Sequence, residues 1–131
     1  MEKYSQLDQD TWILNQTNYK KDGFFVEIGA YDGQHLSNTY ILEKEYNWSG
    51  ICAECNPQTI PSLIQNRNCE IETRALFNRN NLNVPFYSGE DPTLAQIFYT
   101  ESVTDEKTGK ILYPQHVVKT VDINTMLEEH N

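Results

Sequence analysis

Two carboxylates and two glycines lie close together in the segment GFFVEIGAYDG, residues 23–33. Glu27 interrupts an apolar run, and Asp32 lies in a turn of small residues between Gly29 and Gly33. Glycine lets the backbone turn tightly and lets a ligand approach it without an intervening side chain. An apolar run that ends in such a turn, here called the elbow (residues 29–33), is typical of a strand that leads into a ligand-binding loop.

Two classes of ligand use an elbow of this kind, and the acids distinguish between them. A dinucleotide places its pyrophosphate against a G-x-G-x-x-G turn at the start of a helix, but Tyr31 stands where the second glycine would be. Glu27 and Asp32 would also repel the phosphates. A cofactor with a positive centre and no phosphate, such as S-adenosylmethionine, suits the two carboxylates, so we expect it ahead of a nicotinamide dinucleotide.

A third acid supplies the other half of such a site. Glu54 ends the apolar segment ICAE and follows Gly33 by 21 positions (54 − 33), close to the spacing of about 20 at which an acid after the second strand binds ribose hydroxyls. Each feature alone has a plain structural explanation: Glu27 as a solvent-facing strand residue, the elbow as an ordinary turn, Glu54 as a strand-end acid. Their order and spacing together favour the binding site.

The elements that must hold these residues alternate between helix and strand. Residues 8–17 predict a short amphipathic helix, and the continuously apolar residues 23–30 predict a central strand that is buried on both faces. The next expected elements are a helix at 37–48 capped by Ser37 or Asn38, a strand at 49–54, a helix at 56–67 begun by Asn56 and Pro57, and a strand at 69–76. This order with short connections is typical of a parallel sheet built from right-handed crossovers.

The second half of the chain changes in character. We expect short strands within residues 78–89 and 95–100, a polar Thr-Gly turn within 104–114, and a strand at 116–122. Asp122 is placed to cap a final helix that begins at residue 123. The polar residues 89–115 carry the weakest pattern.

Composition limits the classes of partner. With 131 residues the chain has room for one domain, and its 10 basic against 19 acidic residues give a net charge of -9, which repels nucleic acid and anionic membranes. Without an apolar run that could span a bilayer and without a signal-peptide pattern, we expect a soluble, cytoplasmic protein. We expect no metal site, because the histidines are scattered along the chain. Cys52 lies in a predicted strand, where residues three positions apart point to opposite faces, so Cys55 would not face the same way.

The chain resembles the amino-terminal half of the FkbM-type methyltransferases in a series of motifs. In chain order these are S-Q-x-x-Q-D, F-V-E-I-G-A-x-D-G, S-N-T, L-E, W-x-G and E-x-N-P, which cover residues 4–88 well and the tail at 116–129 more loosely. The resemblance implies an α/β, Rossmann-like class I methyltransferase fold that transfers a methyl group from S-adenosylmethionine to a hydroxyl oxygen of a sugar or secondary metabolite. It identifies no general base, so no catalytic residue is predicted.

The resemblance also implies roles for individual residues. The cofactor would be held by Glu27, Gly29, Ala30, Tyr31, Asp32, Gly33, Asn38, Glu54 and Asn56. Glu27 and Asp32 would face the methionine end of the cofactor, and Glu54 the ribose. A leading helical segment, residues 1–22, would fold over the site or tie itself to the sheet through Ser5, Gln6, Gln9 and Asp10.

The chain departs from the family pattern in its length. A strand-helix-strand unit takes roughly 30 residues, so we expect residues 23–131 to form a partial domain, truncated before the fourth strand, with one side of the first strand unpaired. The enzyme would act on a small-molecule or glycan acceptor. The alternative function is a noncatalytic cofactor-binding or interaction domain that docks through the open edge, by self-association or with a partner.

Overall fold

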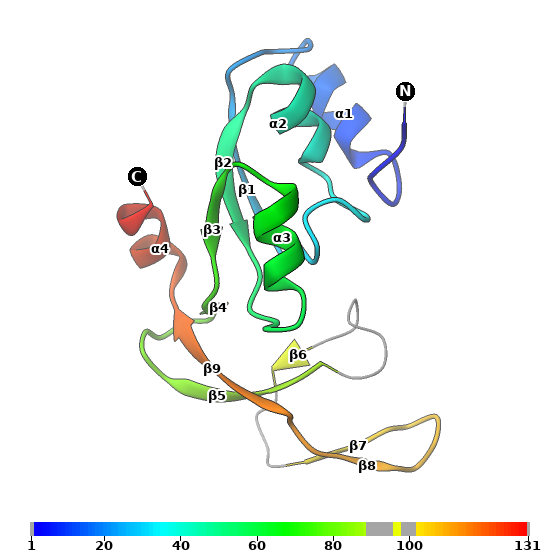
Figure 1. The fold of residues 1–131 in the computed structure, drawn as a ribbon, viewed down its shortest axis with the longest axis vertical. Helices are drawn as coiled ribbons and strands as arrows, with labels where there is room; N and C mark the ends of the chain where they lie inside the picture. Colours follow the sequence, from blue (N-terminus) through cyan, green and yellow to red (C-terminus); the bar gives the residue numbers. More distant parts are fainter. Residues whose placement is uncertain (1, 89–95, 98–101, 131) are drawn as a thin grey trace.

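The computed structural model of the chain describes residues 2–88, 96–97 and 102–130. Within them, four helices and nine strands form a mixed α/β fold (Figure 1). The strands make a three-stranded sheet, a four-stranded sheet and a two-stranded ribbon. The α/β class expected from the sequence is therefore confirmed. No helix of the described residues is long and apolar enough to cross a membrane.

The first sheet carries the residues of the predicted site. It is parallel, and its strands in spatial order are β1 (Phe24–Ile28), β2 (Ser49–Ala53) and β3 (Glu70–Glu72). Helices α2 (Tyr40–Tyr46) and α3 (Ile60–Asn66) make the two crossovers and lie on the same side of this sheet (Figure 1). The parallel sheet predicted for the first half of the chain is confirmed.

Apolar side chains form a core on the helical side of this sheet. Phe25 and Cys52 pack against Leu63 of α3 in one cluster. Helix α1 (Gln9–Gln16) packs on α2 through Leu14, which is fully buried. Alternating residues of β1 and β2 thus hold the two crossover helices in place, as expected for a strand with one buried face.

The first strand lies at the edge of its sheet. Phe24, Val26 and Ile28 point away from the helical side and are 58%, 37% and 58% exposed, because helix α4 (Ile123–Glu129) packs there against β2 and leaves β1 open. The prediction of a central strand buried on both faces is therefore wrong: a continuous apolar run does not reveal which neighbours cover it. As expected, no described strand pairs with the outer edge of β1.

Helices α2 and α3 begin later than predicted. The Asn56 side-chain oxygen accepts a main-chain amide two residues further on, at 3.0 Å, so a tight turn that includes Pro57 precedes α3. Thr39 is the residue that precedes α2, but the Ser37 hydroxyl accepts the amide of Tyr40 at 3.1 Å. The side chain of Ser37 therefore supplies the predicted cap from one turn earlier.

The strand predicted at 69–76 divides into two. After β3 the chain turns at Arg74, whose amide and guanidinium both bond to the Glu72 carboxylate, at 2.9 and 2.7 Å. The next strand, β4 (Ala75–Leu76), pairs in the second sheet instead. Strand-forming residues predict extended backbone, but not which sheet each part joins.

The second sheet has the strand order β4-β9-β5-β6. Its other strands are β5 (Asn83–Tyr87), β6 (Gln96–Ile97) and β9 (His116–Val121), while β7 (Val103–Thr104) and β8 (Ile111–Leu112) form the ribbon. The strands predicted within 78–89 and at 116–122 are confirmed. Of the strand predicted at 95–100, residues 96–97 are in β6 and the others lie outside the described residues. The Thr-Gly turn joins β7 to β8, with Gly109 at φ 69°.

Asp122 caps the final helix as predicted. Its carboxylate accepts the amide of Thr125 at 2.8 Å and the side-chain amide of Asn80. These hydrogen bonds, that of Thr125 first, hold the pKa of Asp122 below its ordinary value of 3.8. A group whose pKa is lower in the folded state stabilises the protein above its unfolded pKa, and this contribution is lost as the pH falls through the folded pKa.

Replacing Asp122 by asparagine is therefore expected to flatten the acid side of the stability profile. The amide can still accept the Thr125 hydrogen bond but has no proton to gain, so the decline of stability below pH 3.8 should be shallower than in the wild type. Urea unfolding midpoints measured between about pH 2 and 5 test this. Glu128→Gln, an exposed change on the same helix, is the control; equal slopes in the wild type and Asp122→Asn would contradict the expectation.

Candidate functional site

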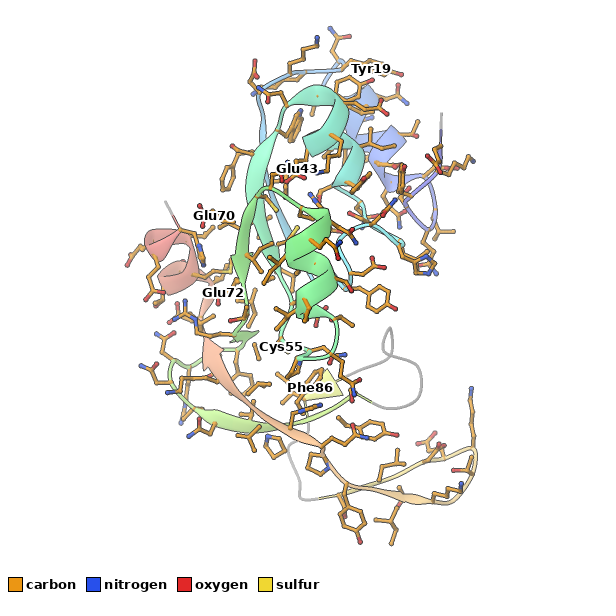
Figure 2. The ribbon with its side chains drawn as sticks, in the orientation of Figure 1. Tyr19, Glu43, Cys55, Glu70, Glu72 and Phe86 are labelled. Atoms are coloured by element: carbon orange, nitrogen blue, oxygen red, sulfur yellow. The ribbon has the colours of Figure 1, made fainter. Side chains whose placement is uncertain are left out.

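A cavity of about 360 Å³ opens where β1 and β2 end. One wall comes from the end of β1, the elbow and the residues after β2, and the other from β4, β5 and β6 of the second sheet. Cys55 and Phe86 pack near each other along this cavity (Figure 2). The carboxyl end of a parallel sheet is where ligands bind in open α/β folds, and here the second sheet encloses that end.

The cavity wall includes five of the nine predicted cofactor-binding residues. These are Glu27, Gly29, Ala30, Tyr31 and Glu54. The other four, Asp32, Gly33, Asn38 and Asn56, are not part of its wall. The structure thus brings together the end of β1, the first half of the elbow and the acid after β2.

The elbow is held by main-chain hydrogen bonds and by backbone of positive φ. The amides of Gly29 and Ala30 both donate to the carbonyl of Ala53, at 2.8 and 3.0 Å, which fixes the elbow against the end of β2. Gly29 has φ 74°, and a Cβ added there would meet no atom within 4 Å. Its Cα therefore faces open space beside the cavity, as required for close approach of a ligand to the backbone.

Gly33 is required for a different reason. Its φ is 82°, and an added Cβ would lie 2.6 Å from Cγ of Arg67 and 2.7 Å from Cδ1 of Leu63. The two glycines of the elbow therefore divide their roles: Gly29 opens the cavity, while Gly33 lets α3 and the residue after it pack closely.

The carboxylate of Glu54 holds the two sides of the site together. One oxygen accepts the amide of Tyr31 and the other the amide of Asn56, each at 2.9 Å. Glu54 is half-buried and lines the cavity, and it has no basic partner among the described residues. Because a carboxylate oxygen can accept two hydrogen bonds, each oxygen keeps capacity for a ligand donor.

Glu27, by contrast, is committed to the protein. Its buried carboxylate accepts hydrogen bonds from the Ser37 and Thr39 hydroxyls and from the Asn38 amide. The guanidinium of Arg67 lies 3.5 Å away. Glu27 thus ties the end of β1 to the start of α2, and its charge is balanced inside the protein.

Arg67 is a buried residue that supports the elbow, and the sequence patterns did not reveal it. Its buried side chain donates to Glu43 at 3.0 Å, to the Gly33 carbonyl at 3.1 Å and to the Thr39 hydroxyl at 3.0 Å. Burial disfavours its charge, but the neighbouring Cys52, Glu43 and Cys69 outweigh burial and raise the pKa of Arg67. These hydrogen-bond partners lie 24 to 34 positions away in the chain and Glu27 lies 40 away (67 − 27), so no local motif could mark it.

Most charged side chains at the cavity are paired within the protein or lie outside the cavity wall. Arg67 neutralises Glu27, and Asp32 lies outside the cavity wall, where it accepts the amides of Gln34 and His35 at 2.9 and 2.7 Å. Arg74 is on the wall but is paired with acids. Preference for a cationic ligand over a phosphate therefore rests on Glu54.

The two asparagines of the predicted set are tied into the protein next to the cavity wall. Asn38 donates its amide to Glu27, and its buried Oδ1 has no hydrogen-bond partner among the described residues. Asn56 is almost fully buried, and its Nδ2 likewise has no described partner. The main-chain amide of Asn38 donates to Glu27 and that of Asn56 to Glu54, so both residues help to hold the two carboxylates in place.

The leading segment lies next to the loop that follows the elbow. Ser5 forms an isolated parallel bridge with Leu36, which lines the cavity, and its hydroxyl donates to Asp10 at 2.6 Å. The Gln9 side chain accepts the amide of Leu7 at 2.7 Å. The side chains of Ser5, Gln9 and Asp10 thus form hydrogen bonds within the leading segment. The main-chain bridge from Ser5 to Leu36 places this segment next to the cavity.

Searches against family models, curated proteins and solved structures found no match to this chain.

Proposed function

We propose that the cavity binds S-adenosylmethionine and that the chain is a partial Rossmann-like class I methyltransferase domain, as the FkbM resemblance implies. The reaction would transfer a methyl group to a hydroxyl oxygen of a sugar or secondary metabolite. The observation that carries the proposal is the position of Glu54: an acid with no basic partner in the described part of the chain, on the same cavity as the open backbone of Gly29. The order of the strands, β1-β2-β3, is compatible with one half of such a fold.

The residues present fit this cofactor. The cavity, about 360 Å³, falls within the range of roughly 300–1,000 Å³ that is typical of small-molecule sites. Glu54 would accept hydrogen bonds from the ribose hydroxyls, and the elbow at Gly29 and Ala30 would lie against the cofactor without a large side chain between them. When bound, S-adenosylmethionine supplies an electrophilic methyl group. The task left to the protein is to hold the acceptor oxygen in line with it, where positioning supplies most of the rate.

Methyl transfer itself is tested with S-adenosylmethionine labelled in its methyl group. The full chain is incubated with a panel of glycosides and hydroxylated metabolites, and the organic products are counted. Label that appears in one acceptor only when the protein is present supports the enzyme. Cofactor binding without transfer to any acceptor would favour the noncatalytic alternative.

Replacing Glu54 by alanine is expected to weaken cofactor binding by roughly 10- to 100-fold, the equivalent of about 1.5–3 kcal/mol for charge-assisted hydrogen bonds. Equilibrium dialysis compares S-adenosylmethionine with S-adenosylhomocysteine, which has the same ribose but no sulfonium charge. If Glu54 accepts hydrogen bonds from the ribose, the substitution should weaken the binding of both ligands by the same factor. Glu70→Ala, an exposed acid on β3, is the matched control, and a loss as large in this control would contradict the assignment.

The open edge of β1 favours a second candidate, an interaction domain that pairs with another copy of itself. Antiparallel pairing of two β1 strands about Val26 would place Phe24 opposite Ile28 of the other copy, so that exposed apolar side chains meet only apolar ones. Val26→Lys should then abolish self-association measured by sedimentation while the chain stays folded. A wild-type chain that stays monomeric at high concentration would exclude this candidate.

A further inference from the structure

Two cysteines lie in one apolar cluster on the helical side of the first sheet. Cys52 is in β2, opposite Ile71 of β3, and Cys69 directly precedes β3. They belong to the same apolar cluster, in which Cys69 packs against buried Cys52 and its neighbours. The interaction between the two thiols raises the pKa of Cys52 and lowers that of Cys69. Cys69 lies in a bend just before β3 and outside the strand register, which leaves its backbone room to adjust.

The two thiols differ in access and in acidity. Cys52 is fully buried, whereas Cys69 is half-buried and within reach of solvent. The neighbouring Cys52 thiol and the charge of Arg67 lower the pKa of the Cys69 thiol, against the effects of burial and of Glu43. Hence Cys69 has the thiolate character that reacts with oxidants, while Cys52 lies next to it as a second thiol.

Cys55 provides an internal comparison. It is also half-buried and free, but burial and the neighbouring charge of Glu54 raise its pKa to about 11. At neutral pH it is therefore almost entirely the unreactive thiol. Two cysteines of similar exposure are thus expected to behave differently because only one has a thiol partner and a nearby cation.

We propose that Cys52 and Cys69 form an oxidisable dithiol, which a hydroperoxide converts to a disulfide between β2 and β3. The Cys69 sulfur attacks the peroxide, forming a sulfur–oxygen bond as the oxygen–oxygen bond breaks, and the released alkoxide or hydroxide takes a proton. The Cys52 sulfur then attacks Cys69. The sulfur–sulfur bond forms, the sulfenic hydroxyl leaves with the Cys52 proton as water, and the two thiols have lost two electrons and two protons to the peroxide.

Such a disulfide would close a loop around the central part of the candidate site. The enclosed residues, 53–68, contain Glu54, helix α3 and Arg67. Oxidation would therefore fix the crossover that carries the cavity acid and the buried guanidinium. The proposal stands independently of the ligand that the cavity binds.

Peptide mapping after peroxide treatment of the full chain tests the proposal. Non-reducing digestion should yield one cross-linked pair of peptides, containing Cys52 and Cys69, that a dithiol reductant separates. Cys55 should stay open to alkylation and react at least about tenfold more slowly with peroxide than Cys69. Cross-links that involve Cys55, or peroxide consumption that leaves Cys52 a free thiol, would overturn the proposal.

Two variants sharpen the test. In Cys52→Ala the cross-link should disappear, and dimedone should instead trap a sulfenic acid on Cys69. In Cys55→Ser the yield of the cross-link should match that of the wild type. If Cys52→Ala does not fold, the wild-type map and Cys55→Ser decide the question alone, since a cross-link lost in Cys55→Ser would also overturn the proposal.

Discussion

Replacing Arg67 by methionine is expected to lower the free energy of unfolding by about 3–5 kcal/mol, the typical cost of removing one partner from a buried ion pair. The substitution keeps much of the apolar stem but leaves the carboxylate of Glu27, only 9% exposed, without its cation, and leaves Glu43, 8% exposed, paired with Lys44 alone. It also removes the donors to the Gly33 carbonyl and the Thr39 hydroxyl. Since whole domains are stable by about 5–15 kcal/mol, urea unfolding should show a large shift of the midpoint.

A matched arginine on the surface controls this experiment. Arg79 is exposed, so Arg79→Met should change the unfolding free energy by no more than about 0.5 kcal/mol. A triple variant, Arg67→Met with Glu27→Gln and Glu43→Gln, removes the stranded charges and should recover part of the loss. Equal midpoints for Arg67→Met and Arg79→Met would show that the buried guanidinium does not hold the elbow.

The second large effect is expected at Gly33. Alanine there must adopt φ near 82° and place its methyl group 2.6 Å from the Arg67 side chain and 2.7 Å from Leu63. Left-handed backbone costs about 1–2 kcal/mol and overpacking about 1–3 kcal/mol, so a total loss of about 3 kcal/mol is expected. Thermal or urea unfolding of the purified variant measures it.

Gly29→Ala is the matched control for Gly33→Ala, because the two glycines have similar φ values and different surroundings. At Gly29 the methyl group would meet no atom within 4 Å, so only the backbone cost of about 1–2 kcal/mol applies. The same methyl group would stand beside the cavity and should weaken ligand binding. If both variants lose the same stability, close packing of Gly33 against Arg67 is not what requires glycine there.

Local patterns predicted the elements of this fold well, since short-range chemistry decides them. Asp122 caps α4 because a carboxylate three residues before an amide can accept it, and the alternation of β and α segments was enough to predict the parallel sheet. Exposure was not predictable in the same way. Phe24, Val26 and Ile28 form an apolar strand whose outer face is open, and only the position of α4 over β2 reveals this.

The candidate site, like the fold, could be predicted from the sequence only in part. The spacing from the elbow to Glu54 predicted that both lie on one cavity, because the crossover between two neighbouring parallel strands brings their carboxyl ends together. The state of Glu27 could not be predicted, since it depends on Arg67, 40 positions later in the chain (67 − 27). The second wall, with Phe86 and Ile97, depends on the turn at Arg74, where the chain passes from β3 in the first sheet to β4 in the second. The local sequence does not predict this turn.

Calorimetric titration of the wild-type chain with S-adenosylmethionine tests most directly the claim that this cavity binds a cationic, phosphate-free cofactor. We expect one-to-one binding with micromolar affinity, tighter than that of NAD in the same experiment, and an affinity roughly 10- to 100-fold weaker in Glu54→Ala. The absence of any binding heat at millimolar S-adenosylmethionine, or tighter binding of NAD, would contradict it.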